Sequence, residues 1–336
     1  MESMNLRRDL PASLVVFLVA VPLSLGIALA SGAPVIAGLI GAVAGGIVTG
    51  LLAGSPLQVS GPAAGLTVVV FGLVQQLGWE TVCLATACAG LVQLLLGYLK
   101  VARGTLVIAP SVVHGMLAGI GISIALAQLH VLLGGSPASS PIANLIALPG
   151  RLGAFSPAAA TLGIVTIFVL VLWKKLPWAG LRAIPAPLVA VVTGTVVSLV
   201  AKMDVARIDL PETLAFTQLK LPAEWGGFII AVLTLAIIAS VESLLCAVAT
   251  DKLHSGERSN LDKELTAQGA GNLVSGLLGG LPITGVIVRS SANINAGGAS
   301  RWSAVFHGVW VLLCVLFLGS MIESIPLAVL AGLLVH

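Results

Sequence analysis

Long apolar runs, separated by short charged, Gly-rich or Pro-rich breaks, fill the chain from residue 10 to its last residue. A run of about 20 mostly apolar residues is long enough to cross a bilayer as a helix. We therefore predict an all-α, polytopic membrane protein. The predicted spans are 10–30, 33–54, 61–77, 80–99, 107–132, 157–174, 185–201, 225–250, 265–280, 285–295 and 302–322, with a twelfth over 324–336.

The connections between these spans are more polar. We expect a Ser/Pro-rich loop over 134–156, a mixed surface segment over 203–224 and a charged loop over 251–264. Nearly all charged residues are expected in such loops. Glu242 and Arg289 are the exceptions, because both lie deep in predicted spans.

Composition supports the membrane assignment. Of the 336 residues, 58% are hydrophobic and 9% are charged, whereas a soluble globular chain carries about 25% charged residues. The chain has no basic block, so we expect no nucleic-acid partner. It has no Walker A motif, HExxH motif or nucleophile elbow, and no cysteine spacing typical of a metal site. We therefore expect neither an enzyme nor a bound metal or cofactor.

The basic residues predict an orientation. With the N-terminus inside, eleven of the 16 Lys and Arg residues fall on the inner side and four on the outer side, with Arg289 left in the membrane. The positive-inside rule then predicts a cytoplasmic N-terminus in the cell (inner) membrane.

A short motif occurs twice. Leu57–Gly61 and Leu281–Gly285 both read Leu-x-(Val/Ile)-(Ser/Thr)-Gly, and each precedes an unusually short predicted span. The two copies are seven spans apart, so they have opposite orientations in the membrane. Such paired, interrupted segments indicate an inverted repeat and the binding site of a transporter. Chance similarity in a Gly-rich apolar chain is the alternative.

We expect each copy to be a short extended strand that leads into a half-helix. The free N–H groups at a half-helix start carry partial positive charge, and two such starts near the midplane would form an anion site. Arg289 lies one turn into the second half-helix. The predicted substrate-binding residues at the two motifs are Ser60, Gly61, Pro62, Ala63, Thr284, Gly285, Val288 and Arg289.

Glu242 is the second charge expected inside the membrane. It pairs with Arg289, binds a cation or carries a proton; Arg289 itself either faces the anion, reaches a membrane surface or is tied to Glu242. In the matching first span, Pro22 is expected to kink or break the helix. Leu23 and Ile27 would then face the cavity, unless they face lipid or the protein core.

Together these segments resemble the SulP family of inorganic anion transporters, the bacterial relatives of animal sulfate/anion exchangers and prestin. The resemblance covers nearly the whole chain. The residues that carry it are 22–34, Val59–Ala63, Ala109–Val113 with Gly115 and Gly119, and Val288–Asn293 with Gly297 and Gly298.

The resemblance implies a seven-plus-seven inverted repeat with core and gate domains, of which this chain holds about 12 of 14 segments, and a homodimer in the full-length form. The core would comprise residues 1–104 and 225–323. The gate would comprise residues 105–224 and begin again over 324–336. Arg289 matches the family's arginine near the anion, Glu242 its acidic position in the eighth span, and Leu23 and Ile27 its substrate-facing positions in the first span.

Two departures from the family pattern change the expectation. The chain ends in the twelfth span without the usual STAS domain, so we expect a fragment of a longer protein. Sodium-coupled bicarbonate members carry Asp and, one turn later, a hydroxyl residue, whereas this chain has Glu242 and Cys246. This difference favours coupling to protons over coupling to sodium through these two residues, or else exchange of one anion for another.

We therefore predict a secondary active transporter of bicarbonate or sulfate that works by elevator-like alternating access. An uncoupled anion channel and a nucleobase permease of the same fold are the alternatives.

Overall fold

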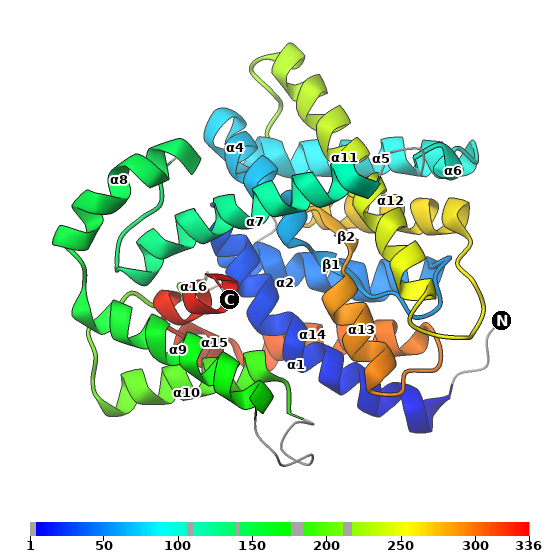
Figure 1. Ribbon diagram of the computed structural model, residues 1–336. Coiled ribbons are helices and arrows are strands. Elements are labelled where there is room, and N and C mark those ends of the chain that lie inside the picture. The colour runs from blue at the N-terminus through cyan, green and yellow to red at the C-terminus, as the bar shows by residue number, and fades with distance from the viewer. Residues whose placement is uncertain (1–4, 106–109, 139–140, 176–183, 211–216, 336) are drawn as a thin grey trace.

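The computed structural model describes residues 5–105, 110–138, 141–175, 184–210 and 217–335. Helices dominate it (Figure 1). The helices are α1 (Leu6–Ala30), α2 (Val35–Val43), α3 (Gly50–Leu52), α4 (Thr67–Leu77), α5 (Trp79–Tyr98), α6 (Ala102–Thr105), α7 (Pro110–Leu132), α8 (Pro141–Gly153), α9 (Pro157–Lys175), α10 (Ala186–Val200), α11 (Trp225–Asp251), α12 (Leu261–Leu277), α13 (Ile287–Asn295), α14 (Trp302–Phe317), α15 (Gly319–Glu323) and α16 (Leu327–Val335). A π-helical segment, η1 (Ala44–Thr49), joins α2 to α3, and a 3₁₀ turn, η2 (Ala64–Leu66), precedes α4.

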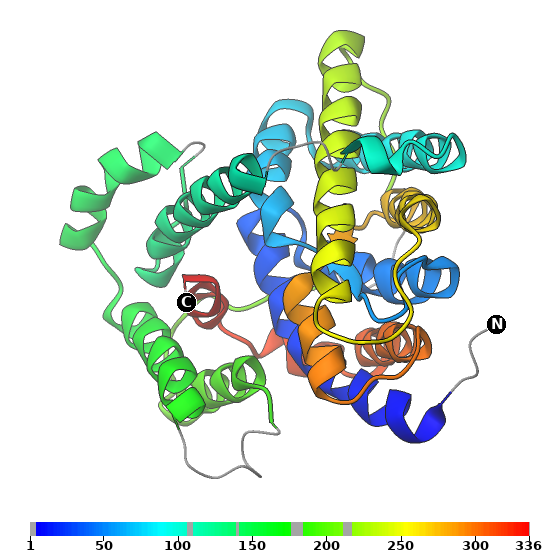
Figure 2. The same ribbon diagram turned by 45° about the vertical axis from the view of Figure 1, so that its right-hand side comes forward.

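The helical class is confirmed, and most predicted spans coincide with helices. Four spans of the described residues are long and apolar enough to cross a membrane as one helix: α1, the run Val35–Leu52, α5 and α11. Shorter apolar helices form much of the rest. In the views of Figures 1 and 2, α8–α10 gather on one side, while α5 and α11–α13 lie on the other.

Three expectations about the connections were wrong. Residues 141–153 of the predicted Ser/Pro-rich loop form helix α8, which meets α9 at an angle of 116°. The predicted span 302–322 breaks at Leu318 into α14 and α15. Helix α12 begins at Leu261, because the side chain of Asn260 accepts a hydrogen bond from the backbone N–H of Lys263 and so caps the helix; Glu264 therefore belongs to a helix and not to a loop.

The two repeated motifs form strands that pair with each other. β1 (Ser60–Pro62) and β2 (Ile283–Gly285) are antiparallel, with Ser60 opposite Gly285 and Gly61 opposite Thr284. β1 continues through η2 into α4, and β2 continues into α13. The pair thus lies at the start of both short helical segments, deep among α1, α2, α11 and α12.

A polar face of α12 completes the hydrogen bonds of the strand pair. The side chain of Asn272 donates to the carbonyl of Ile283 (3.0 Å) and accepts from its N–H (2.7 Å), as a third strand would. Ser275 donates to the carbonyl of Leu281 (2.6 Å), and Gln268 donates to the hydroxyl of Ser60 (2.5 Å). Buried backbone groups in a membrane protein need such partners, since lipid supplies none.

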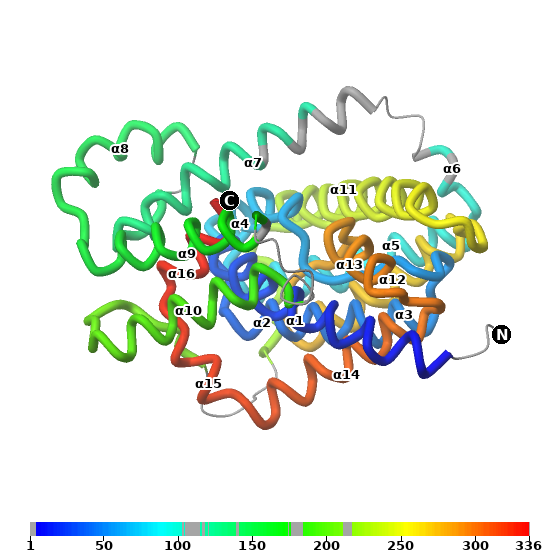
Figure 3. The backbone as a smooth tube through the Cα atoms, turned by 60° about the horizontal axis from the view of Figure 1, so that its bottom comes forward, coloured from blue at the N-terminus to red at the C-terminus, as the bar shows by residue number. Residues whose placement is uncertain are grey.

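Two glycines allow α12 to lie directly against α5. A Cβ atom placed on Gly269 would fall 2.7 Å from the carbonyl oxygen of Gly90, and one placed on Gly90 would fall 2.6 Å from that of Gly269. Both distances are shorter than real Cβ contacts, so the two backbones touch. Small residues at helix contacts of this kind are typical of membrane proteins. Figure 3 shows a second long contact, in which α1 runs beside α14.

Replacing Gly269 tests this contact. We expect Gly269→Ala to lower the free energy of unfolding by about 1–3 kcal/mol, because the added methyl group pushes the α5 backbone away. Gly72→Ala in α4 is the matched control, since a Cβ there meets nothing within 4 Å. Thermal unfolding of the detergent-purified protein measures both. Equal stability of the two variants would contradict the close packing of α5 on α12.

Candidate functional site

The strand pair places two helix starts beside each other. The backbone N–H of Val286, which precedes α13, donates to the carbonyl of Val59 (2.9 Å) and extends the pairing by one residue. The N–H groups in the first turn of a helix have no partner within the helix and carry partial positive charge. This part of the molecule therefore attracts negative charge.

Arg289 lies against this strand pair and is fully buried. Its Nη2 donates to the hydroxyl of Ser24 in α1 (2.9 Å) and to the carbonyl of Pro62 (3.4 Å). Gly61 packs directly on the guanidinium, where a Cβ atom would clash with Nη1. Among the described residues, Nε and Nη1 have no hydrogen-bond partner. A buried guanidinium with two unused N–H sites is costly unless a ligand or water occupies them.

Glu242 lies beside residue 65, at the other end of the segment 61–65 that leads from β1 into η2. Its carboxylate packs against Gly65, where a Cβ atom would fall 2.7 Å from Cδ. Its Oε2 has no partner among the residues described. The sequence left open an ion pair between Glu242 and Arg289, and this pair is not formed. Within the described ranges, the two charged side chains close enough to form an ion pair are Asp251 and His254. Residues 61–65 are therefore flanked by a cation at one end and a carboxylate at the other.

Cys246 connects Glu242's helix to the helix of Arg289. Its Sγ lies 4.0 Å from the hydroxyl of Ser290 and 3.9 Å from that of Thr250. Ser290 in turn accepts from the N–H of Val59 (3.0 Å) and donates to the carbonyl of Val286 (2.9 Å). The predicted coupling position thus contacts the residue that follows Arg289 and, through it, Val59 and Val286, which flank the strand pair at one end.

The other predicted binding residues are arranged unequally around Arg289. Gly61 and the carbonyl of Pro62 touch the guanidinium. Ser60 is turned toward Gln268 of α12, and the Thr284 hydroxyl donates to the carbonyl of Gly285 (3.1 Å). The hydroxyls of both motif residues are therefore engaged with the protein rather than with Arg289.

Four predicted residues are apolar and lie in different surroundings. Ala63 is buried, 4% exposed, while Val288 is 55% exposed, on another face of α13 from Arg289. In α1, Ile27 packs in an apolar cluster with Leu66, and Leu23 packs against a second cluster. The first-span residue that contacts Arg289 is Ser24, which our sequence analysis missed. Its signal was a polar residue two positions after Pro22, within a helix that continues unbroken from Leu6 to Ala30.

Two further buried charges contradict the expectation that Glu242 and Arg289 are the clear exceptions. Asp9 and Glu264 are both fully buried. Asp9 accepts hydrogen bonds from the turn at Ala299 and Ser300, and Glu264 accepts four from backbone and side-chain N–H groups. Each lies in the first turn of its helix. Acidic residues are common there on solvent-exposed helices too, so the sequence did not indicate that these two are buried.

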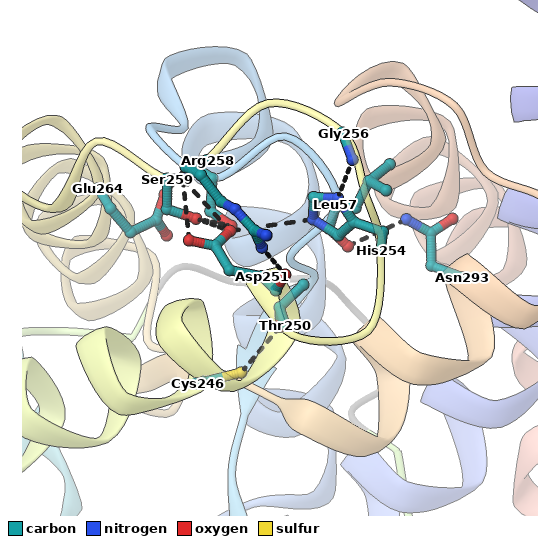
Figure 4. Close-up of polar contacts among 11 residues, drawn as sticks. Leu57, Cys246, Thr250, Asp251, His254, Gly256, Arg258, Ser259, Glu264 and Asn293 are labelled. Atoms are coloured by element: carbon teal, nitrogen blue, oxygen red, sulfur yellow. Dashed lines mark hydrogen bonds and ion pairs between the residues drawn. The ribbon is translucent and has the colours of Figure 1, made fainter.

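The connection between α11 and α12 is fixed by polar contacts at the end of this site (Figure 4). Asp251 accepts from the N–H (3.0 Å) and hydroxyl (2.7 Å) of Ser259. The Ser259 hydroxyl also lies 2.8 Å from that of Ser55, in the segment that leads to β1. The C-terminal end of Glu242's helix is thereby tied to the strand that touches Arg289.

A cleft reaches the start of α4. Thr67, the first residue of α4, lines it, and its hydroxyl has no partner in the described part of the chain. The cleft lies among α1, α4, α7 and α8, and its remaining lining is mostly apolar, formed by Ala30, Phe71, Ile124, Ala127 and Asn144 among others.

Comparison with known proteins identifies the family. The model of the sulfate permease family matches residues 6–336. The chain belongs to this family. It is 31% identical over 341 residues to the putative sulfate transporter YvdB of Bacillus subtilis, covering 98% of this chain and 63% of that protein. It is also 31% identical over 352 residues to the bicarbonate transporter BicA of Picosynechococcus sp., covering 98% of this chain and 60% of that protein.

Solved structures agree with the fold. The transmembrane domain of a cyanobacterial bicarbonate transporter, BicA, superposes with a TM-score of 0.91 at 30% identity, covering 100% of this chain and 89% of that chain. SLC26A9 superposes with a TM-score of 0.85 at 18% identity, covering 99% of this chain and 57% of that chain, and so supports the fold alone. The chain spans 60–63% of the length of the two curated relatives named above. Both curated relatives are named as anion transporters, one of them putatively.

Proposed function

We propose that this chain is the membrane part of a secondary active transporter for a small inorganic anion, bicarbonate or sulfate. One observation carries the proposal: Arg289 is fully buried at the strand pair, and two of its guanidinium nitrogens lack partners among the described residues. The starts of α4 and α13 add partial positive charge at the same place. An anion bound here would use the unpaired N–H groups and offset the buried charge.

The substrate class follows from size and chemistry. Guanidinium and backbone N–H groups suit oxyanions, which accept several hydrogen bonds at once. The names of the relatives point to sulfate for one and bicarbonate for the other. A nucleobase permease would need an array of amides or paired carboxylates at the site, whereas the charges next to residues 61–65 are one carboxylate and one guanidinium.

Glu242 supports proton coupling. Its carboxylate contacts Gly65, and Gly61, four residues earlier, contacts Arg289. Anion binding at Arg289 and protonation of Glu242 would therefore both act on the segment 61–65. Protonation of Glu242 would remove one negative charge as the anion arrives. Cys246 would transmit this change, because its sulfur lies 4.0 Å from the Ser290 hydroxyl.

We further propose elevator-like movement of the predicted core, 1–104 and 225–323, against the predicted gate, 105–224 and 324–336. The antiparallel pairing of β1 with β2 supports the underlying inverted repeat. The cleft beside Thr67 lies between α4 of the predicted core and α7 and α8 of the predicted gate. A cytoplasmic N-terminus and a homodimer complete the proposal, the first from the positive-inside distribution of Lys and Arg.

Substitution of Arg289 tests the binding site. We expect Arg289→Ala to weaken binding of sulfate and bicarbonate by more than about tenfold, since hydrogen bonds to a charged group contribute about 1.5–3 kcal/mol each. Anion-dependent thermal stabilisation of the purified protein and uptake into proteoliposomes measure the loss. Arg207→Ala is the matched control: Arg207 contacts the carbonyl of Ser324, outside the strand pair. Unchanged binding in Arg289→Ala would contradict the site.

Substitution of Glu242 tests the coupling. If protons accompany the anion, wild-type uptake rises as the external pH falls, and Glu242→Gln makes uptake independent of pH because the amide does not titrate. Uptake at a series of external pH values, with internal pH fixed, measures this. A wild-type pH profile in Glu242→Gln would remove the proton role, and steady currents far above a transporter's turnover would favour an uncoupled channel.

A further inference from the structure

Glu264 forms a hydrogen-bonded cluster that the proposed transport mechanism does not use. Its Oε2 accepts from the backbone N–H groups of Gly54 and Ser55, each at 2.9 Å. Its Oε1 accepts from the side-chain amides of Gln58 and Gln268, also each at 2.9 Å. All four partners are donors, which suits an ionised carboxylate, since that group only accepts.

Both amides reach the strand pair. The Gln268 amide nitrogen also donates to the hydroxyl of Ser60 in β1 (2.5 Å). The Gln58 amide packs on Gly285 in β2, where a Cβ atom would fall 2.6 Å from its Cδ. Ser60 and Gly285 are opposite each other in the strand register. One carboxylate oxygen therefore holds both members of a single residue pair.

This residue pair adjoins the anion site directly. Gly61, the next residue of β1, packs on the guanidinium of Arg289, and Gly285 lies four residues before Arg289 at the start of α13. A shift of either strand would move the guanidinium relative to the helix start of α4. Sites that depend on converging groups lose affinity when those groups are displaced by a fraction of an ångström.

We propose that Glu264 is a positioning residue for anion binding, which acts through Gln58 and Gln268 to hold β1 and β2 in the register that aligns Arg289 with the starts of α4 and α13. The inference rests on the proposed function. Glu264 does not touch the anion itself, since its four hydrogen bonds connect it to residues 54–58 and 268.

Asp9 provides a matched control, because it is an equally buried carboxylate with four donors but lies away from the strand pair. It accepts from the N–H groups of Asn5 (3.1 Å), Ala299 (2.8 Å) and Ser300 (3.0 Å) and from the hydroxyl of Ser300 (2.6 Å). A purely structural role of a buried carboxylate would appear equally in both variants.

The test compares Glu264→Gln with Asp9→Asn. We expect both to lower the unfolding temperature, because an amide nitrogen replaces an acceptor among N–H donors. At temperatures where each variant is folded, Glu264→Gln should raise the Kd for sulfate or bicarbonate about tenfold, while Asp9→Asn leaves it within about twofold. A wild-type Kd in folded Glu264→Gln, or an equal shift in Asp9→Asn, would overturn the proposal.

A second variant covers the case in which Glu264→Gln does not fold. Gln268→Met keeps the carboxylate and its other three donors and removes the bond to Ser60, so we expect a Kd rise of about threefold or more. An unchanged Kd in this variant would also overturn the proposal.

Amide hydrogen exchange without any anion separates this inference from the proposed function. Exchange at Gly61, Thr284 and Gly285 should be faster in Glu264→Gln than in Asp9→Asn. If the wild-type protein binds neither anion, the proposed function fails, whereas exchange still reports whether Glu264 holds the strands. Equal exchange in the two variants would refute the positioning role.

Discussion

The pairing of β1 with β2 is the interaction on which the rest of the structure depends. Two three-residue strands, more than 200 residues apart in the sequence, hydrogen-bond to each other inside a helical membrane protein. Irregular backbone at this depth is tolerated only when protein groups satisfy it. The strands satisfy each other on one side. On the other side, Asn272 of α12 bonds to the backbone of Ile283, and Ser275 bonds to the carbonyl of Leu281 just before β2. The close contact of α12 with α5 then holds this polar face in place.

Arg289, Glu242 and Glu264 lie around the strand pair, whereas the buried Asp9 lies away from it. These four charges differ in how they are satisfied. Asp9 and Glu264 each accept four hydrogen bonds from the protein. Arg289 and Glu242 keep atoms without partners in the described residues. The satisfied pair stabilises the fold, whereas the unsatisfied pair is available for a ligand and a proton, which is the division of roles that our proposal requires.

The sequence predicted the helical class, most span positions and both strands, because apolar run length and a five-residue repeat are local signals. It also located Arg289 and Glu242, since charges are rare in apolar runs. It did not predict the partners of these residues. Ser24 and Gln268 are ordinary polar residues in helices, and only the three-dimensional arrangement brings them to Arg289 and Ser60. Helix α8 was missed because Ser, Pro and Gly near its ends suggested a loop, although residues 141–153 have an apolar periodicity that is helical.

The most direct test is to locate a bound anion. Selenate is a sulfate analogue whose selenium can be found by anomalous scattering in crystals of the protein. Our account predicts one selenate between the starts of α4 and α13, within hydrogen-bond distance of Nη1 or Nε of Arg289. A selenate bound elsewhere, with the Arg289 guanidinium still bonded to Ser24 and Pro62 alone, would contradict it.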